Sequence, residues 1–388
     1  MAMQVELSQD LVEEILVWLP SQSLLRFKCI SKQWNLLFSN QGFIQRHMKT
    51  RSSLHPHQVL FIRNSDCTLS IGTPHNNEED GILFQPVKTK PQHLHIKYNV
   101  VGHCNGLMCI VDHSAETGGR SFVVWNPSTK KQQRTPVPGK IPWWKGSREY
   151  YGFGYDSTMD DYKIVLVSTS FDKRVEIQSL GMKKDSWEFA QNNTHDSLQR
   201  YLYMSNSHAK HVNGNLYWLI KKKGGGNKRY NGIACFDLSR NRMREEESLS
   251  EKLLSGNRYI ALHLLEDSLC MMQSVDLVDF NAWRMKENQV TKTKSWIKIF
   301  EVSTKHCVFT PLPVLERLTV IVPICFTGNG KVVMVASNRQ FFVLYDPKDE
   351  SFKQAAPCGC GSTGSPICCF PLTPFIESLV SPGRKDAS

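Results

Sequence analysis

Residues 7–34, LSQDLVEEILVWLPSQSLLRFKCISKQW, form a leucine-rich stretch with a helical pattern, unlike most of the chain that follows. From Leu11 to Leu19, apolar residues recur at spacings of one, three and four, as one face of a helix requires. Ser8 can cap this helix, and Pro20 ends it because proline cannot continue the hydrogen-bond pattern. The stretch therefore predicts an N-terminal helix of about two and a half turns.

Two further short helices are predicted, one beginning at Ser21 or Ser23 and one capped by Ser31 and carrying Trp34. Three helices within about 40 residues bury too little apolar surface to be stable alone. Some of their large apolar side chains should therefore pack against another chain. The alternative is that the stretch begins a larger helical domain, although the helical periodicity fades after residue 50.

The order of residues in this stretch resembles the F-box of plant proteins. The residues that carry the resemblance are Leu7, Asp10-Leu11, Glu14-Ile15-Leu16, Leu19-Pro20, Ser23-Leu24, Arg26-Phe27, Cys29-Ile30-Ser31-Lys32 and Trp34. One departure is Ser8, which stands where the family has proline. The resemblance implies binding to the small Skp adaptor of a cullin-based ubiquitin ligase. The adaptor contacts that it implies are Leu7, Asp10, Leu11, Glu14, Ile15, Leu19, Pro20, Ser23, Leu24 and Trp34.

From about residue 58 the pattern changes to short β-strands separated by turn residues. Pairs of strand-like runs begin at residues 106, 162, 214, 268 and 330, which are 52 to 62 residues apart. HQVLFIRNSDCTLSI, from His57, adds a sixth pair. A period near 50 residues with several strands in each unit is typical of a kelch-type β-propeller. A meandering β-sandwich is the alternative.

The sequence thus predicts an α+β multidomain chain: a three-helix F-box domain in residues 1–50 and an all-β, propeller-like domain of six blades in residues 51–388. The second part also resembles a known family, the F-box-associated interaction domain of plants, in the S-locus F-box-like group. The segments that carry this resemblance are VVWNPSTKK (123–131), YGFGYDSTMDDYKIV (151–165), VNGNLYWL (212–219), WRMKEN…SWIKI (283–299) and FIESLV (375–380). The resemblance implies that this domain captures a protein substrate for ubiquitination and degradation.

Residues 139–151, GKIPWWKGSREYY, lie between two repeats and offer residue types that dominate binding energies at protein interfaces. The predicted substrate contacts are Trp143, Trp144, Lys145 and Arg148. The alternative is that one or both tryptophans pack inside a blade.

The chain is basic, with 47 Lys and Arg against 36 Asp and Glu, a net charge of +11 and a pI near 9.0. This balance favours a substrate with an acidic surface. The densest lysine clusters lie beside turn residues, with no basic helix or aromatic–basic platform, so solvated loops explain them better than a nucleic-acid site. We expect no nucleic-acid partner.

No arrangement of residues predicts catalysis or a cofactor. Asp160-Asp161 flanks a turn, where paired carboxylates are usually solvated. Cys358, Cys360, Cys368 and Cys369 supply the four thiols that a zinc site takes, but their spacing departs from paired Cys-x2-Cys knuckles, which favours a loop with free thiols. We therefore expect a non-catalytic ligase subunit that holds a substrate near the ubiquitin carrier, with no catalytic residues, cofactor or metal.

The N-terminal residues do not resemble a signal peptide, and no stretch is apolar for long enough to span a membrane. The twelve cysteines are scattered, so we expect a reducing compartment, cytoplasm or nucleus. Two alternatives remain open: a ligand- or glycan-binding propeller outside any ligase, and a propeller hydrolase or oxidoreductase.

Overall fold

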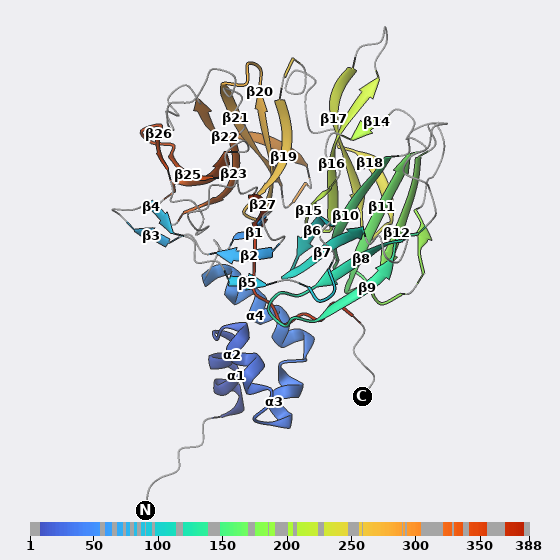
Figure 1. Ribbon diagram of the computed structural model, residues 1–388, viewed down its shortest axis with the longest axis vertical. Helices are drawn as coiled ribbons and strands as arrows, with labels where there is room; N and C mark the ends of the chain where they lie inside the picture. The colour runs from blue at the N-terminus through green and yellow to red at the C-terminus, as the bar shows by residue number, and fades with distance from the viewer. Residues whose placement is uncertain are drawn as a thin grey trace, which may run out of the picture.

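The structure, a computed structural model, describes most of the chain. The described residues are 8–54, 59–63, 68–72, 75–77, 81–83, 87–89, 91–94, 98–113, 119–138, 148–169, 175–184, 186–190, 201–204, 208–223, 229–246, 256–257, 259–288, 290–291, 293–303, 321–327, 330–336, 341–354 and 369–383. In these residues, a small helical domain lies against a ring of antiparallel sheets (Figure 1). No described helix is both long enough and apolar enough to cross a membrane.

The helical domain begins as predicted. Its helices are α1 (Gln9–Val17), α2 (Ser21–Phe27), α3 (Lys32–Leu37) and α4 (Gln41–Leu54). The Ser8 hydroxyl accepts a hydrogen bond from the Leu11 N–H at 3.4 Å, and the Ser31 hydroxyl accepts one from the Gln33 N–H at 3.1 Å. Both predicted N-caps are therefore confirmed, because each hydroxyl satisfies a backbone donor that the helix leaves unpaired.

The prediction of three helices was one short, because α4 was missed. Most of α4 is polar, and only a narrow side of it packs inward, which left a weak helical signal. Asn40 begins the helix by accepting hydrogen bonds from the Gly42 and Phe43 N–H groups at 2.8 and 3.2 Å. The helix continues to Leu54, past the predicted domain boundary at residue 50.

The β-rich part folds into a propeller of six blades, counted over the described residues. Blade 1 contains β27 (Cys369–Pro374), β1 (Val59–Arg63), β2 (Thr68–Gly72) and β5 (Val87–Thr89), and blade 2 contains β6 (Tyr98–Cys104), β7 (Leu107–His113), β8 (Arg120–Trp125) and β9 (Gln132–Pro136). Blade 3 contains β10 (Arg148–Asp156), β11 (Asp161–Thr169), β12 (Val175–Gly181) and β13 (Glu188–Phe189). Blade 4 contains β14 (Tyr201–Met204), β15 (Lys210–Val212), β16 (Asn215–Lys223), β17 (Arg229–Asp237) and β18 (Arg242–Glu245).

The remaining two blades have the same four-stranded form. Blade 5 contains β19 (Tyr259–Leu265), β20 (Ser268–Ser274), β21 (Asp279–Glu287) and β22 (Lys294–Ser303), and blade 6 contains β23 (Ile321–Phe326), β24 (Val332–Ala336), β25 (Phe341–Asp346) and β26 (Ser351–Gln354). A separate hairpin pairs β3 (His75–Asn77) with β4 (Gly81–Leu83). The propeller prediction is confirmed, and the sandwich alternative is wrong for these sheets.

The repeated pair of runs seen in the sequence is the pair of middle strands of each blade. In blade 2, for example, β7 pairs with both β6 and β8, and Leu107 to Asp112 are all buried. A middle strand can be covered on both faces by neighbouring blades, which is why β7 is apolar from Leu107 to Val111. The last strands of the blades are more exposed, as β9 is, and therefore carry a weaker signal.

Two features close the ring. The C-terminal strand β27 pairs with β1, so the first and last parts of the propeller complete one blade together. The contacts between different blades run mainly through their first strands, β6, β10, β15, β19, β23 and β27. These first strands therefore form the inner ring of the propeller, around its centre (Figure 1).

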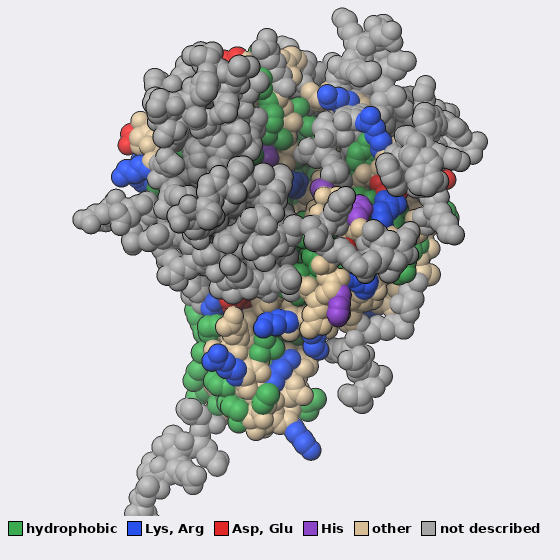
Figure 2. Space-filling view, in the orientation of Figure 1, with side chains coloured by type: hydrophobic (Ala, Val, Ile, Leu, Met, Phe, Trp, Pro, Cys, Tyr) green, Lys and Arg blue, Asp and Glu red, His purple; other side chains and the backbone are tan. Residues whose placement is uncertain are grey.

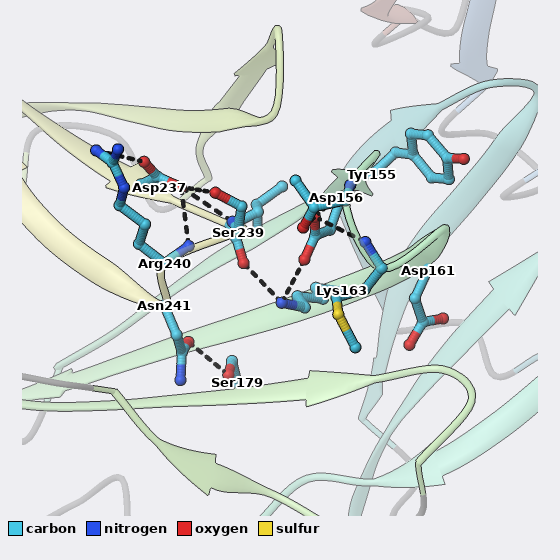
Figure 3. A network of polar contacts seen from close by, with 12 residues as sticks. Tyr155, Asp156, Asp161, Lys163, Ser179, Asp237, Ser239, Arg240 and Asn241 are labelled. Atoms are coloured by element: carbon cyan, nitrogen blue, oxygen red, sulfur yellow. Dashed lines mark hydrogen bonds and ion pairs between the residues drawn. The ribbon is translucent and has the colours of Figure 1, made fainter.

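Polar contacts also join neighbouring blades (Figure 3). The Lys163 ammonium on β11 lies 2.7 Å from a carboxylate oxygen of Asp156 and donates to the carbonyl oxygen of Leu238 at 2.6 Å. Nearby, the Ser179 hydroxyl donates to the Asn241 side-chain oxygen at 2.7 Å. Blades 3 and 4 are thus held in register by specific hydrogen bonds as well as by apolar packing.

Candidate functional site

The helical domain carries a row of exposed apolar side chains. Leu11, Ile15 and Trp18 lie on α1 and its C-cap at spacings of four and three, so they share one face of the helix. Their exposed fractions are 54%, 55% and 57%. Large apolar side chains exposed in a contiguous group mark an interaction surface. We call these three residues the α1 stripe (Figure 2 shows exposed apolar side chains on the helical domain).

Two more large apolar side chains on this small domain are exposed, Ile30 and Leu36. The opposite side of α1 is buried, with Leu16 and Val17 in the core. One side of α1 therefore packs in the core, and the other side is exposed to solvent.

The residues predicted to contact an adaptor fall into three groups. Exposed are Asp10, Leu11, Glu14, Ile15 and Pro20. Half-buried are Leu19, Ser23 and Trp34. Leu24 is fully buried in the core, so its part in adaptor binding can only be indirect, through the packing of the helices. Leu7 lies outside the described residues.

Trp18 was missed by the sequence prediction, although it continues the helical spacing from Leu11 and Ile15. The helical spacing includes Trp18, but its position directly before Leu19-Pro20 is typical of the end of a helix.

Of the predicted substrate contacts, Trp143, Trp144 and Lys145 lie outside the described residues. Arg148 is exposed at the start of β10, and its backbone carbonyl oxygen accepts a hydrogen bond from the Thr169 hydroxyl at 3.3 Å. The four cysteines weighed for zinc lie in residues whose side chains the structure does not describe. Among described residues, no group of three or more His, Cys, Asp or Glu could hold a metal ion.

The helical domain is fixed to the propeller by a continuous apolar core. Buried residues of the helices, including Phe38 and Phe43, belong to the same cluster as Val101, Phe153 and Tyr162 of blades 2 and 3. A cluster that crosses the boundary opposes independent movement of the two parts, since separating them would expose this apolar surface to water.

Polar contacts strengthen the same junction. The Asp160 carboxylate accepts hydrogen bonds from the Tyr155 hydroxyl and from the Gln41 side-chain amide of α4, the latter at 3.2 Å. Asp160 is therefore a junction residue in addition to being a turn residue. The Glu377 carboxylate accepts from the Ser21 N–H at 3.3 Å and lies 3.6 Å from the Arg51 guanidinium.

The segment that contains Glu377, residues 375–380, ties the end of the chain to blade 2. Phe375 packs in the core of that blade, while Leu379 and Val380 join the core shared with the helices. The Asn126 side-chain amide donates to the carbonyl oxygens of Ser378 and Val380 at 3.0 and 2.7 Å. We call residues 375–380 the C-terminal clasp, because they contact both parts of the molecule.

We predict that Glu377→Ala lowers the free energy of unfolding by about 2 kcal/mol, because Arg51 is almost fully buried and would lose its acidic partner. Denaturant unfolding of the full chain measures the change. The matched control is Glu188→Ala, which removes an exposed ion pair to Lys184 at 2.7 Å and should have almost no effect. Equal effects of the two substitutions would contradict the role given to Glu377.

Comparison with known proteins identifies the family. A model of the F-box domain matches residues 5–46, and a model of the F-box associated beta propeller domain matches residues 58–382. This chain belongs to the F-box proteins that carry this propeller domain. The helical domain is thus the F-box, and the blades form its associated propeller.

Relatives of this F-box protein are known from Arabidopsis thaliana. The F-box protein CPR1 is 24% identical over 377 residues, which cover 92% of this chain and 86% of that protein. The F-box/kelch-repeat protein At3g23880 is 27% identical, over 86% of this chain and 88% of that protein. Among solved structures, the SapL1 lectin in complex with alpha methyl fucoside has a TM-score of 0.41 and 8% identity, covering 79% of this chain and 97% of that chain, a likeness that carries no argument about function.

Four histidines lie on or next to the inner strands of the propeller. His103 lies on β6, His211 on β15 and His263 on β19, and His208 lies two residues before the start of β15. Burial lowers the pKa of His103 and His263 to about 3, and that of His208 and His211 to about 4. The four imidazoles are therefore neutral in the folded F-box protein at neutral pH.

These histidines predict a steep loss of stability in acid. Below a pH of about 6.5 the unfolded chain binds protons that the folded chain does not, so stability falls with falling pH until the folded imidazoles also titrate, at pKa values of about 4 for His208 and His211 and about 3 for His103 and His263. Each buried histidine contributes up to about 1.4 kcal/mol per pH unit in this window. Urea unfolding between about pH 7.5 and about pH 5 measures the slope, and His263→Gln should reduce it by one histidine's share. An identical slope in the variant would contradict the assignment.

Proposed function

We propose that this chain is the substrate-recognition subunit of a Skp–cullin–F-box ubiquitin ligase. The F-box would dock the Skp adaptor and, through it, the cullin, while the propeller would bind a protein substrate. The observation that carries the proposal is the α1 stripe: Leu11, Ile15 and Trp18 are exposed on the side of the F-box that its own core does not cover. Burying such side chains in a partner is worth about 1.5 to 3 kcal/mol each.

The rigid junction supports the same function. A ligase subunit of this kind is not itself an enzyme and acts by proximity, holding a substrate lysine near the ubiquitin carrier. That requires a fixed geometry between the adaptor-binding side and the substrate-binding side. The shared core and the C-terminal clasp supply such a geometry, because they join α2 and α4 to blades 2 and 3.

We place this function in the cytoplasm or nucleus. The described cysteines Cys29, Cys104, Cys109, Cys235 and Cys270 are all free thiols, which fits a reducing compartment.

The test is binding of the purified full chain to a purified plant Skp adaptor by surface plasmon resonance, followed by recruitment of the cullin. We expect saturable binding of one adaptor per chain. Variants at Leu19 or Pro20 are poor probes, because the Leu19 side chain packs against the core shared with the propeller and Pro20 is the N-cap residue of α2. No binding by a folded chain would overturn the proposal and favour a ligand- or glycan-binding propeller.

A further inference from the structure

The centre of the propeller gathers basic groups from several blades. Lys210 lies on β15, one of the inner strands, and β15 contacts both β6 and β19 across the ring. Burial is the main cause that lowers the pKa of His103, His208 and His263, and the positive charge of Lys210 is the second cause for each. The Lys210 ammonium therefore lies close to all three imidazoles. Figure 2 shows histidine and basic side chains between the grey residues near the middle of this face.

Lys210 has no acidic partner among the described residues. The other lysines that lie deep in the described propeller are paired: Lys163 with Asp156 at 2.7 Å, and Lys294 with Glu246 at 2.7 Å. Burial alone lowers the pKa of Lys210, with no carboxylate to oppose the shift. Lys210 is half-buried, and an ammonium group partly removed from water without an anion is costly to the fold.

A second orphan group lies in the same ring. The Nε2 atom of His263 is buried and has no hydrogen-bond partner in the described structure. His211 differs from it, because its Nδ1 lies 3.4 Å from the Cys104 sulfur and its Nε2 lies 3.3 Å from the Tyr155 N–H. His211 therefore serves the packing between blades 2, 3 and 4, whereas Lys210 and His263 are left without a structural role of this kind.

We propose that the centre of the propeller is a binding site for an oxyanion of the phosphate class, held by Lys210 with imidazole N–H groups of the inner strands. A phosphate group carries several acceptor oxygens, so it can receive hydrogen bonds from donors that converge from different strands. Its negative charge supplies the partner that Lys210 lacks, in a place where the low dielectric strengthens the pair. This site is independent of adaptor docking by the F-box.

Two sources can supply such a group: free phosphate, or a phosphorylated side chain of a bound protein. The probes are therefore inorganic phosphate and a short glycine–serine peptide with one phosphoserine, beside its unphosphorylated form. Isothermal titration of the full chain at constant ionic strength should show saturable binding of one inorganic phosphate per chain. Tighter binding of the phosphopeptide, displaced by inorganic phosphate, identifies a modified side chain as the source, whereas binding of inorganic phosphate alone identifies the free anion.

Lys210→Met should weaken phosphate binding about ten- to hundredfold, the size of effect that a lost charge-assisted hydrogen bond produces. The matched control is Lys286→Met, an equal change of charge at an exposed position on β21, which should leave the affinity unchanged. Folding of Lys210→Met is checked by its melting temperature in phosphate-free buffer, which should rise, because the substitution removes an uncompensated charge at a half-buried position.

The proposal is overturned if phosphate does not saturate the wild-type chain, or if Lys210→Met and Lys286→Met lose affinity equally, as general charge attraction would require. Failure of the proposed ligase function would be distinguishable from failure of the phosphate site. It would appear as lost adaptor binding in a chain that still binds phosphate, and Lys210→Met should bind the adaptor as well as the wild-type chain does.

Discussion

Replacing Leu11 and Ile15 together by aspartate should weaken binding of a Skp adaptor by at least about a hundredfold, while the chain stays folded. Both side chains are more than half exposed, so the fold does not depend on them. In a complex they would be buried, and each aspartate would then bring an unpaired charge into an apolar interface. The loss therefore combines missing apolar contact with a desolvation cost.

Surface plasmon resonance against the immobilised adaptor measures this loss, and the melting temperature checks the fold. The control is Val290→Asp, which changes an apolar side chain that is 90% exposed on the propeller. It should bind the adaptor like the wild-type chain. Full binding by the Leu11→Asp, Ile15→Asp variant would show that the α1 stripe is not the docking surface.

Gly106→Ala should lower the free energy of unfolding by about 3 to 5 kcal/mol. Gly106 has a φ of +76°, a conformation that costs an L-residue roughly 1 to 2 kcal/mol. A Cβ atom there would also lie 2.6 Å from the Ile376 carbonyl oxygen and 2.4 Å from the Ser378 hydroxyl oxygen. Alanine would therefore push the C-terminal clasp away from blade 2 as well as strain the turn.

Gly330→Ala separates these two causes. Gly330 has a φ of +83°, but a Cβ atom there would meet nothing within 4 Å. This variant should lose only the strain, roughly 1 to 2 kcal/mol. Because the clasp holds the junction, Gly106→Ala should also expose the F-box to limited proteolysis at a lower denaturant concentration than Gly330→Ala does. If Gly106→Ala and Gly330→Ala lose the same stability, contact with the C-terminal clasp does not explain the effect at Gly106.

Much of the fold could be predicted because the relevant signals are local. Ser8 and Ser31 cap helices through groups two or three residues away, and a middle strand such as β7 is buried on both faces, so it is apolar from Leu107 to Val111. The missed helix α4 shows where such reasoning fails. Its buried side includes His47 and Arg51, which are polar, and they are tolerated there because Leu19 and Glu377 contact them.

The sequence by itself determined the helical unit, the repeat of paired strands and the absence of a recognisable catalytic motif, because caps, periodicity and spacing act over a few residues. The tertiary structure alone decided which apolar residues remain exposed: Leu11 and Leu24 look alike in the sequence, yet one is open to solvent and the other is fully buried. It also decided that Glu377 meets Ser21 and that Lys210 meets histidines of other blades. These pairings join residues far apart in the chain, and only the closure of the ring brings them together.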